Sequence, residues 1–434
     1  MADFSIRLEV DGLDGALLGV RAATLFEELS AVASAVIEIH CDGALPETQE
    51  LLHRDCVLSI ERDAQSRSFR GVVQHAEVRQ AAEGAVLTLR AAPAMAYLEH
   101  IVDTRIYQDM TVLDVIQDLF EEKLGDRARR VRNECGTHDV HEYLVQYNES
   151  CLAFAQRLLE REGIFYYFDH GGDHETLVLA DAVSSCLPVR GGAEIPFSAQ
   201  ADQALDHEAI ASVHSAERSG SISHGQPELP LEPGTHRQVV THDHRDGRYR
   251  ARSAEGQAKM TGTVVSAQPG RTFTLSGAPE PSFDGRYLIL QSRTVAVAVE
   301  GAKGFLTQDM VVHPTGRPYV PPCKTPVPII HGMELATVVG PDGAEVHTDE
   351  HGRIKVQFPW DRQGRNDRGS SCWIRVAQMW GGILWGTHFT PRVGTEVIVS
   401  FLCGHPDRPV MIGSLYNGAH RPPYAPQGRT AQVS

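Results

Sequence analysis

The sequence lacks the signals of secretion, membrane insertion and disulfide stabilisation. Its eight cysteines are scattered and form no Cys-x-x-Cys pair, so we expect them to be buried thiols in a reducing cytosol. The N-terminus, MADFSIRLEV, has neither the basic region nor the apolar stretch of a signal peptide. Because no run of about 18 apolar residues occurs, we expect no stable membrane insertion either.

Motifs that carry catalysis or hold nucleotides are also missing. There is no Gly-x-Ser-x-Gly elbow for a hydrolase nucleophile, no phosphate-binding loop ending in Gly-Lys-Ser/Thr and no Gly-x-Gly-x-x-Gly fingerprint. The formal net charge is −16 at pH 7, and the excess of acidic residues lies in residues 1–330. An acidic body of this kind argues against nucleic acid as a partner. We therefore predict no cofactor, no nucleic-acid binding and no enzymatic activity.

Most of the remaining pattern is that of β-strands. Residues 1–95 contain short runs that alternate apolar and polar positions, such as FSIRLEV and AVLTLRA, and predict a first β-barrel region. Residues 181–313 return to the same pattern in runs such as TFTLSGA and RYLILQSRTVAVAVE, and predict a second β-barrel region.

An α/β insertion is predicted between these regions, at residues 96–180. Thr111 is the expected N-cap of one helix, which ends at a glycine. Asn148 or Ser150 caps a second helix, which ends at Gly163 and leads directly into the strand IFYYF. The periodicity thus changes from two residues to that of helices and back again within one segment.

The strongest predicted domain boundary is the linker at residues 314–330. Its stretch PTGRPYVPPCKTPVP holds six prolines in fifteen residues, which favours an extended, semi-rigid connector. Residues 331–418 then contain about five strand patterns, among them RIKVQFPW and CWIRVAQ, and predict a small closed barrel of the OB-fold type. Residues 419–434 form the remaining tail. The predicted fold class is therefore mainly β with a small α/β part.

Two groups of histidines raise the question of a metal site. His347 and His351 are four residues apart, as in a zincin, but a glycine follows and the flanks alternate like strands, so we interpret both as turn residues. His236, His242 and His244 lie in the polar stretch THRQVVTHDHRDG, where no ligand spacing is satisfied. We predict no metal site. A metal-dependent hydrolase that uses this second group is the alternative from another functional class, and stoichiometric zinc in the purified protein would favour it.

All four tryptophans lie in the predicted OB-fold. Aromatic residues concentrated in so small a domain usually belong to a core or to a protein interface. The connection DRQGRNDRGS adds charged residues, which form either a solvated hairpin loop or the rim of an interface. We predict an interface that includes Arg362, Arg365, Arg368, Trp380 and Trp385.

Longer motifs run through the same region. The string HTDEHGRIKVQFPWDRQGRNDRGSSCWIRVAQMWGG continues through GTHFTPRVGTEVIVSFLCGHPDRPVMIGSLYN. The spacings TDE-x-GR-x-KVQF-x-WDR, SSCW-x-RV and PRVG-x-EV within it are long and specific, and they resemble the VgrG family, the spike proteins of bacterial type VI secretion systems. The segments QYNESCLAFAQRLLEREGIFYYF and FDGRYLILQSRTVA resemble earlier parts of the same family, so the resemblance covers essentially the whole chain.

The resemblance implies an architecture and a set of partners. The fold would be a phage-tail-hub-like double β-barrel region followed by an OB-fold neck. Three chains would form a homotrimer whose six barrels match a hexameric tube of Hcp protein. In the family a β-helix follows the neck and carries a PAAR tip protein, an effector or an adaptor. Only about fifteen residues follow GSLYN here, so these last partners are expected only if a further C-terminal region is present.

The predicted function is therefore that of a structural hub and spike without catalysis. The resemblance implies that such a protein is made in the bacterial cytoplasm and translocated by the secretion apparatus to the extracellular space or into a target cell. A phage baseplate hub is the alternative within the same class, and neighbouring sheath and tube genes, as opposed to capsid genes, would distinguish the two.

Overall fold

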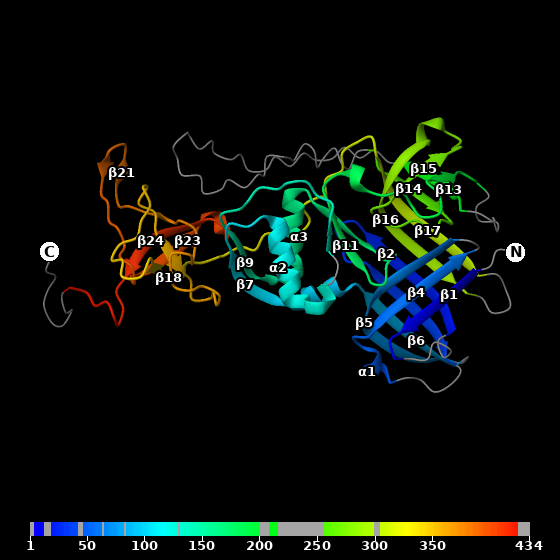
Figure 1. Ribbon diagram of the computed structural model, residues 1–434, viewed down its shortest axis with the longest axis horizontal. Helices are drawn as coiled ribbons and strands as arrows, with labels where there is room; N and C mark the ends of the chain where they lie inside the picture. The colour runs from blue at the N-terminus through cyan, green and yellow to red at the C-terminus, as the bar shows by residue number, and fades with distance from the viewer. Residues whose placement is uncertain are drawn as a thin grey trace.

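In the computed structural model the chain is elongated, with a large β region at the N-terminal end, two helices near the middle and a small barrel at the C-terminal end (Figure 1). The structure describes residues 4–12, 19–41, 47–62, 65–81, 84–128, 131–199, 208–215, 256–298 and 304–423. In these ranges, no helix has the length and apolar character needed to cross a membrane. The mainly β fold with a small α/β part is confirmed.

A 12-stranded sheet joins the two predicted β-barrel regions. The first region supplies β1 (Phe4–Val10), β2 (Gly19–Glu28), β3 (Ser34–Cys41), β4 (Asp55–Arg62), β5 (Gln65–Ala81) and β6 (Gly84–Ala92), with the short helix α1 (Thr48–Leu51) between β3 and β4. The second supplies β12 (Glu194–Pro196), β13 (Ile210–Ser215), β14 (Ala258–Gly262), β15 (Thr272–Ser276), β16 (Gly285–Val297) and β17 (Phe305–Pro314). The seam is the antiparallel pair β2 and β16, in which Ala23 lies opposite Ala296.

Alternation of apolar side chains explains the strands of the first region. In β1, Leu8 and Val10 are buried and Glu9 between them is exposed. The same period continues in β4, where Leu58 lies opposite Leu8 and is fully buried. Since successive side chains of a strand point to opposite faces, this pattern places one face of each strand in the core.

The α/β insertion consists of β7 (Val102–Tyr107), α2 (Val112–Leu124), β8 (Val131–Asn133), β9 (Leu144–Ser150), α3 (Cys151–Glu162), β10 (Phe165–Asp169) and β11 (Thr176–Ala180). Thr111 caps α2 in a capping box with Asp114, as predicted. Ser150 caps α3 by accepting from the backbone of Ala153, and Gly163 ends α3 in the left-handed conformation with φ of 74°. Short 3-10 helices lie in the connections of the chain: η2 (Ala94–His100), η3 (Gly125–Ala128), η4 (Val183–Ser185), η6 (Pro281–Phe283) and η7 (Leu402–Gly404).

The proline-rich connector is anchored along α3 instead of crossing open solvent. The backbone N–H groups of Lys324 and Thr325 both donate to Oε2 of Glu160 on α3, each at 2.9 Å. Further back, the ring of Tyr319 packs edge-to-face on Phe165 with 5.6 Å between centroids. These contacts hold an extended segment that has no ladder hydrogen bonds of its own.

The C-terminal barrel has the five-stranded sheet predicted for an OB-fold. Its order is β19 (Lys355–Gln357), β18 (Glu334–Val339), β23 (Glu396–Phe401), β24 (Pro409–Leu415) and β20 (Arg375–Val376). A bridge between Ile354 and Ile374, with two backbone hydrogen bonds of 2.9 and 2.7 Å, closes the ring between β19 and β20. Ile354, Val356 and Phe358 are fully buried, which confirms the predicted face of RIKVQFPW.

A buried histidine makes the stability of the fold depend on pH. His170 follows β10, its ring packs on Phe69 at 4.7 Å, and its Nδ1 accepts from the backbone N–H of Arg70. Burial first, and then the charge of Arg67, lowers the pKa of His170 to about 3. An unfolded chain titrates His near pH 6.5, so below that pH the unfolded state binds more protons and stability falls as pH falls.

When the pH falls from 7 to 5, protonation of His170 in the unfolded state is expected to lower the free energy of unfolding by about 2 kcal/mol. Urea unfolding at both pH values measures it, with His170→Gln as the comparison. The variant should lose less stability than the wild-type protein over this interval. His138, whose pKa is raised by its hydrogen bond with Glu162, acts in the opposite sense but is present in both proteins. Equal losses in the two proteins would contradict the prediction.

Candidate functional site

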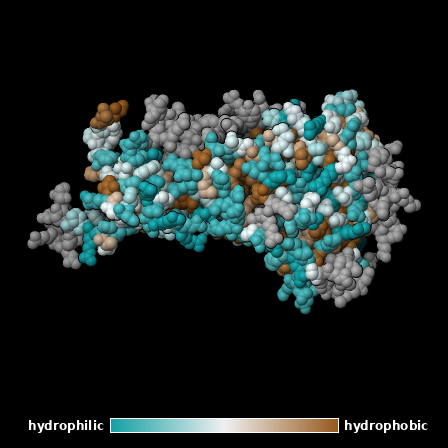
Figure 2. Space-filling view, in the orientation of Figure 1, coloured by the Kyte–Doolittle hydropathy of each residue, from teal (hydrophilic) through white to brown (hydrophobic). Residues whose placement is uncertain are grey.

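The candidate site is a hairpin that projects from the OB-fold barrel. Its strands are β21 (Gly381–Gly382) and β22 (Trp385–Gly386), with the sequence Ile-Leu at the turn. Figure 2 shows a compact hydrophobic cluster at this projecting tip, where Figure 1 places β21. The cluster contains the three most exposed large apolar side chains of the described residues, Met379, Ile383 and Leu384, together with the exposed Trp380, Trp385 and Phe389.

The hairpin is an ordered structure with its own hydrogen bonds. At its base, the side-chain amide of Gln378 donates to the carbonyl of Phe389 at 3.1 Å and accepts from the backbone N–H of the same residue at 2.8 Å. Trp380 and Trp385 pack edge-to-face with 5.1 Å between their centroids. Leu384 has a φ of 60°, which a bulky side chain rarely adopts, and is fully exposed. The backbone therefore presents apolar side chains to the outside.

Such a surface is suited to binding another protein. Large exposed apolar patches on globular proteins mark interaction sites, and Trp is enriched where one partner anchors in another. Trp380 and Trp385 are 65% and 56% exposed. By contrast, Trp360 stacks on the core residue Phe358 at 4.8 Å, and Trp373 packs on His347 at 4.9 Å. The four tryptophans thus divide into two that pack within the barrel and two that face outward.

The three arginines of the predicted interface lie on the loop between β19 and β20. Nη2 of Arg362 donates to Oδ1 of Asp103 in the α/β insertion at 2.9 Å, so this arginine has a partner within the chain. Burial would raise the pKa of Asp103, but hydrogen bonds from Lys123, the backbone of Thr104 and Arg362 lower it below its ordinary value. Arg365 and Arg368 are exposed. The role of the arginines and tryptophans in an interface stays a prediction.

The histidines of the sequence analysis do not form a shared site where the structure describes them. The ring of His347 packs on Trp373, and Nε2 of His351 lies 3.3 Å from Oε1 of Glu350. His236, His242 and His244 lie outside the described residues.

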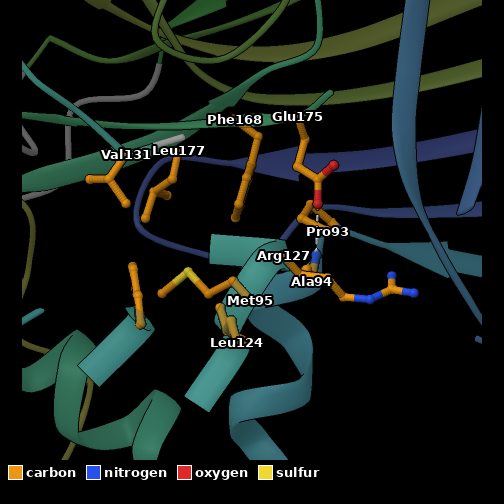
Figure 3. A pocket seen from close by; sticks show the side chains of 10 residues that line it. Pro93, Ala94, Met95, Leu124, Arg127, Val131, Phe168, Glu175 and Leu177 are labelled. Atoms are coloured by element: carbon orange, nitrogen blue, oxygen red, sulfur yellow. Dashed lines mark hydrogen bonds between the residues drawn. The ribbon is translucent and has the colours of Figure 1, made fainter. Parts of the chain in front are cut away.

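A cavity between η2, α2 and the strands β8, β10 and β11 is too small for a cofactor. Its volume is about 30 Å³, which accommodates one or two water molecules. Figure 3 shows Phe168 and Leu177 facing Met95 and Leu124 across it, and a hydrogen bond from the backbone of Ala94 to Glu175 at its edge. Ligand pockets are about ten times larger or more, so this cavity is a small packing void with a mostly apolar lining.

The structure also brings together three side chains that the sequence reasoning missed. One ligand-type atom from each of Cys135, His138 and Asp181 lies within 4.8 Å of the other two. The sequence signal for two of them is the Cys-x-x-His spacing of Cys135 and His138, which begins two residues after the end of β8. Asp181 could not have been added from sequence spacing, because it lies 46 residues beyond Cys135.

Comparisons with known proteins agree with a hub region followed by an OB-fold domain. Residues 27–248 match the family model of the phage tail baseplate hub (GPD), and residues 336–416 match the type VI secretion system/phage-baseplate injector OB domain. Two curated relatives are the type VI secretion system spike proteins VgrG1b and VgrG1a of Pseudomonas aeruginosa. Each is 32% identical over 92% of this chain, which covers 58% of VgrG1b and 67% of VgrG1a.

Solved structures show the same fold. The E. coli c3393 protein, described as a component of the type VI secretion system similar to the phage T4 tail proteins gp27 and gp5, superposes with a TM-score of 0.72 at 21% identity. The alignment covers 94% of this chain and 100% of that one. A chain of the Francisella PdpA–VgrG complex superposes with a TM-score of 0.59 at 8% identity, over 96% of this chain and 72% of that one. The resemblance read from the motifs is confirmed: this chain, which spans about three fifths of the length of VgrG1b, belongs to the VgrG family of type VI secretion system spike proteins.

Proposed function

We propose that this chain is a non-enzymatic hub and spike protein that works as a homotrimer and joins the Hcp tube to the puncturing tip. The observation that carries the proposal is the exposed apolar hairpin of residues 379–389 on the OB-fold barrel. In a trimer this hairpin would bury its tryptophans against a neighbouring subunit, with Arg365 and Arg368 at the polar rim. A neck that transmits force needs such a contact, because the OB-fold barrels of the three subunits belong to separate chains.

The continuous hub sheet supports a mechanical role. Pairing of β2 with β16 makes one sheet of strands from both ends of the hub, so a load on one β region passes to the other through backbone hydrogen bonds. The connector and α3 then join the hub to the neck. Named relatives of this chain are spike proteins, which fits a structural protein without catalysis.

The remaining partners and the route of the protein follow from the same proposal. We infer that Hcp binds at the hub end and that a PAAR tip, effector or adaptor is carried at the neck end when a further C-terminal region is present. One solved relative is named as a PdpA–VgrG complex, which supports carriage of a second protein by a VgrG chain. We infer cytoplasmic synthesis followed by translocation through the apparatus.

Disruption of the hairpin tests the proposed trimer. The double variant Ile383→Ser, Leu384→Ser is expected to shift the protein from trimer to monomer, because each removes an exposed anchor worth about 2 kcal/mol or more if it is an interface hot spot. Sedimentation over a range of concentrations measures the change. Leu187→Ser, on an apolar residue that is 50% exposed far from the neck in sequence, is the matched control and should sediment like the wild type.

Binding to purified Hcp completes the test. The wild-type chain is expected to bind the tube protein, and the hairpin variant should bind more weakly because it presents fewer hub copies together. A wild-type protein that is monomeric at high concentration and also fails to bind Hcp would overturn the proposed function. A trimer that withstands the hairpin substitutions would overturn the role of the hairpin alone.

A further inference from the structure

The cluster of Cys135, His138 and Asp181 follows from the pairing of two short strands. β8 and β11 run parallel, with Asn133 opposite Leu179, and the pairing continues with a hydrogen bond from the backbone of Glu134 to the carbonyl of Leu179 at 2.8 Å. The carboxyl ends of neighbouring parallel strands lie at the same edge of a sheet. Cys135 leaves β8 and Asp181 leaves β11 at that edge, so the two side chains are placed together by the sheet itself.

The three side chains have the geometry of a small ligand set. Nε2 of His138 lies 3.4 Å from Oδ2 of Asp181, and the backbone N–H of Gly136 donates to the same oxygen at 2.9 Å, which fixes the carboxylate. Nε2 of His138 is buried and makes no hydrogen bond that meets normal geometry. A tetrahedral metal with bonds of about 2.1 Å places its ligands about 3.4 Å apart, so a set within 4.8 Å needs to close only slightly.

A carboxylate already lies beside the other ring nitrogen of His138. Its other ring nitrogen, Nδ1, lies 3.6 Å from Oε2 of Glu162 at the end of α3. Oε1 of Glu162 pairs at 3.0 Å with Nε2 of His141, which is 4% exposed in its side chain. A histidine that binds a metal through one nitrogen usually gives its other N–H to a carboxylate, which fixes the tautomer and the orientation of the ring. Glu162 is in the position to do this.

We propose that Cys135, His138 and Asp181 bind a zinc ion, with water as a fourth ligand and Glu162 as the positioning residue for His138. One sulfur, one nitrogen and one carboxylate oxygen form a donor set that suits Zn²⁺ better than Mg²⁺ or Ca²⁺, which prefer oxygen alone. The role is structural and goes beyond the proposed spike function. Zinc would tie the loop of residues 134–142 to the end of α3, where Arg161 lies 3.6 Å from Asp407 of the OB-fold barrel.

Metal titration of the whole chain tests the site. Protein stripped with a chelator is expected to bind one equivalent of Zn²⁺ and to rise in melting temperature as zinc is added. Cys135→Ser and Asp181→Asn should each weaken zinc binding at least tenfold. Glu162→Gln should weaken it by about 10- to 100-fold, because it removes the carboxylate that orients the ring of His138. Cys403→Ser, on an exposed cysteine of the OB-fold barrel, is the matched control and should bind like the wild type.

Cobalt identifies the ligands independently of stability. Co²⁺ in the wild-type protein should show the near-ultraviolet charge-transfer band of a thiolate ligand, and the band should vanish in Cys135→Ser while circular dichroism shows that this variant is folded. Zinc bound equally by Cys135→Ser, with no thiolate band in the wild type, would place the metal elsewhere, for instance on His236, His242 and His244, and would overturn the proposal. Absence of stoichiometric binding at micromolar zinc would overturn it too.

Discussion

Arg67→Ala is expected to lower the free energy of unfolding by about 3–5 kcal/mol, the cost of breaking a buried ion pair by removing one partner. Arg67 on β5 donates through Nη2 to the carboxylate of Glu27 on β2. Its Nη1 donates to the carbonyl of Ala267 at 2.8 Å and to Oγ1 of Thr294 at 3.1 Å. The side chains of Arg67 and Glu27 are only 5% and 4% exposed. Truncation would therefore leave a buried carboxylate without its counter-ion.

The location makes this pair important for the hub as a whole. Glu27 lies on β2 and Thr294 on β16, the two strands that form the seam between the β regions. Gln308 on β17 extends the same buried network by donating to Thr294 at 3.1 Å and to Ser292 at 2.8 Å. Burial lowers the pKa of Arg67 to about 10, which still leaves the guanidinium charged at neutral pH. The seam is thus held by a charged group that belongs to neither of its two strands.

Urea unfolding measures the loss of stability, and two further variants serve as a surface control and as a test of the buried charge. Arg7→Ala removes a side chain that is 67% exposed from a surface pair with Glu61, and should change stability by less than about 1 kcal/mol. The double variant Arg67→Met, Glu27→Leu replaces both charges by apolar groups and should recover much of the loss. If Arg67→Ala unfolded at the same urea concentration as Arg7→Ala, the pair would not hold the seam.

Local features of the fold were predictable because neighbouring residues determine them. The caps at Thr111 and Ser150 depend on a hydroxyl and on the backbone N–H three residues further on, and the end of α3 at Gly163 depends on the conformational freedom of one residue. The buried face of Ile354 and Val356 follows from alternation alone. Each of these is decided within a few residues of sequence.

The seam of the hub was not predictable, since alternation assigns a face to a strand and not a neighbour. Phe26 of β2 lies opposite Arg293 of β16, which is 267 residues away in the sequence. For the same reason, the sequence did not predict that Asp181 lies close to Cys135 or that Asp103 accepts a hydrogen bond from Arg362. Strand pairing and domain docking decide such contacts, and no short motif encodes them.

Which tryptophans are exposed could not be predicted from the sequence. Concentration of tryptophan in one domain indicates either a core or a protein interface, and the structure separates the four side chains: Trp360 stacks on the core residue Phe358, whereas Trp380 is exposed. Composition could not tell the buried tryptophans from the exposed ones. The exposed pair lies on a two-stranded hairpin with only two residues in each strand. Strands this short have too little alternation to be recognised from sequence.

Arg157→Ala is the second substitution expected to have a large effect, about 3–5 kcal/mol of lost stability. Arg157 on α3 donates to Glu149 through Nε at 2.9 Å and through Nη2 at 2.6 Å, and Nη2 also donates to the carbonyl of Val145 at 2.7 Å. The side chains of Arg157 and Glu149 are 4% and 8% exposed. Burial raises the pKa of Glu149 even with these hydrogen bonds, so its ionised form depends on the guanidinium.

This pair also links the helical insertion to the neck. Val145 and Glu149 both belong to β9, and the backbone N–H of Val145 donates to Oδ1 of Asp407 in the OB-fold barrel at 2.8 Å. Tyr143 and Val145 pack in the same apolar cluster as the barrel core. Removing Arg157 is therefore expected to loosen β9 and, with it, the contact between neck and hub.

Two measurements separate this coupling from a general loss of stability. In Arg157→Ala, calorimetry should show the barrel and the hub unfolding in separate transitions, and limited proteolysis should cleave the connector at residues 314–330 sooner than in the wild type. Arg157→Lys keeps the charge but not the forked geometry, so its effect should be intermediate. Arg392→Ala, on a side chain that is 67% exposed and pairs with the exposed Glu345, is the surface control. A single transition at lower temperature with unchanged cleavage would mean that Arg157 stabilises the insertion alone, and that the neck is held to the hub by the connector and Asp407.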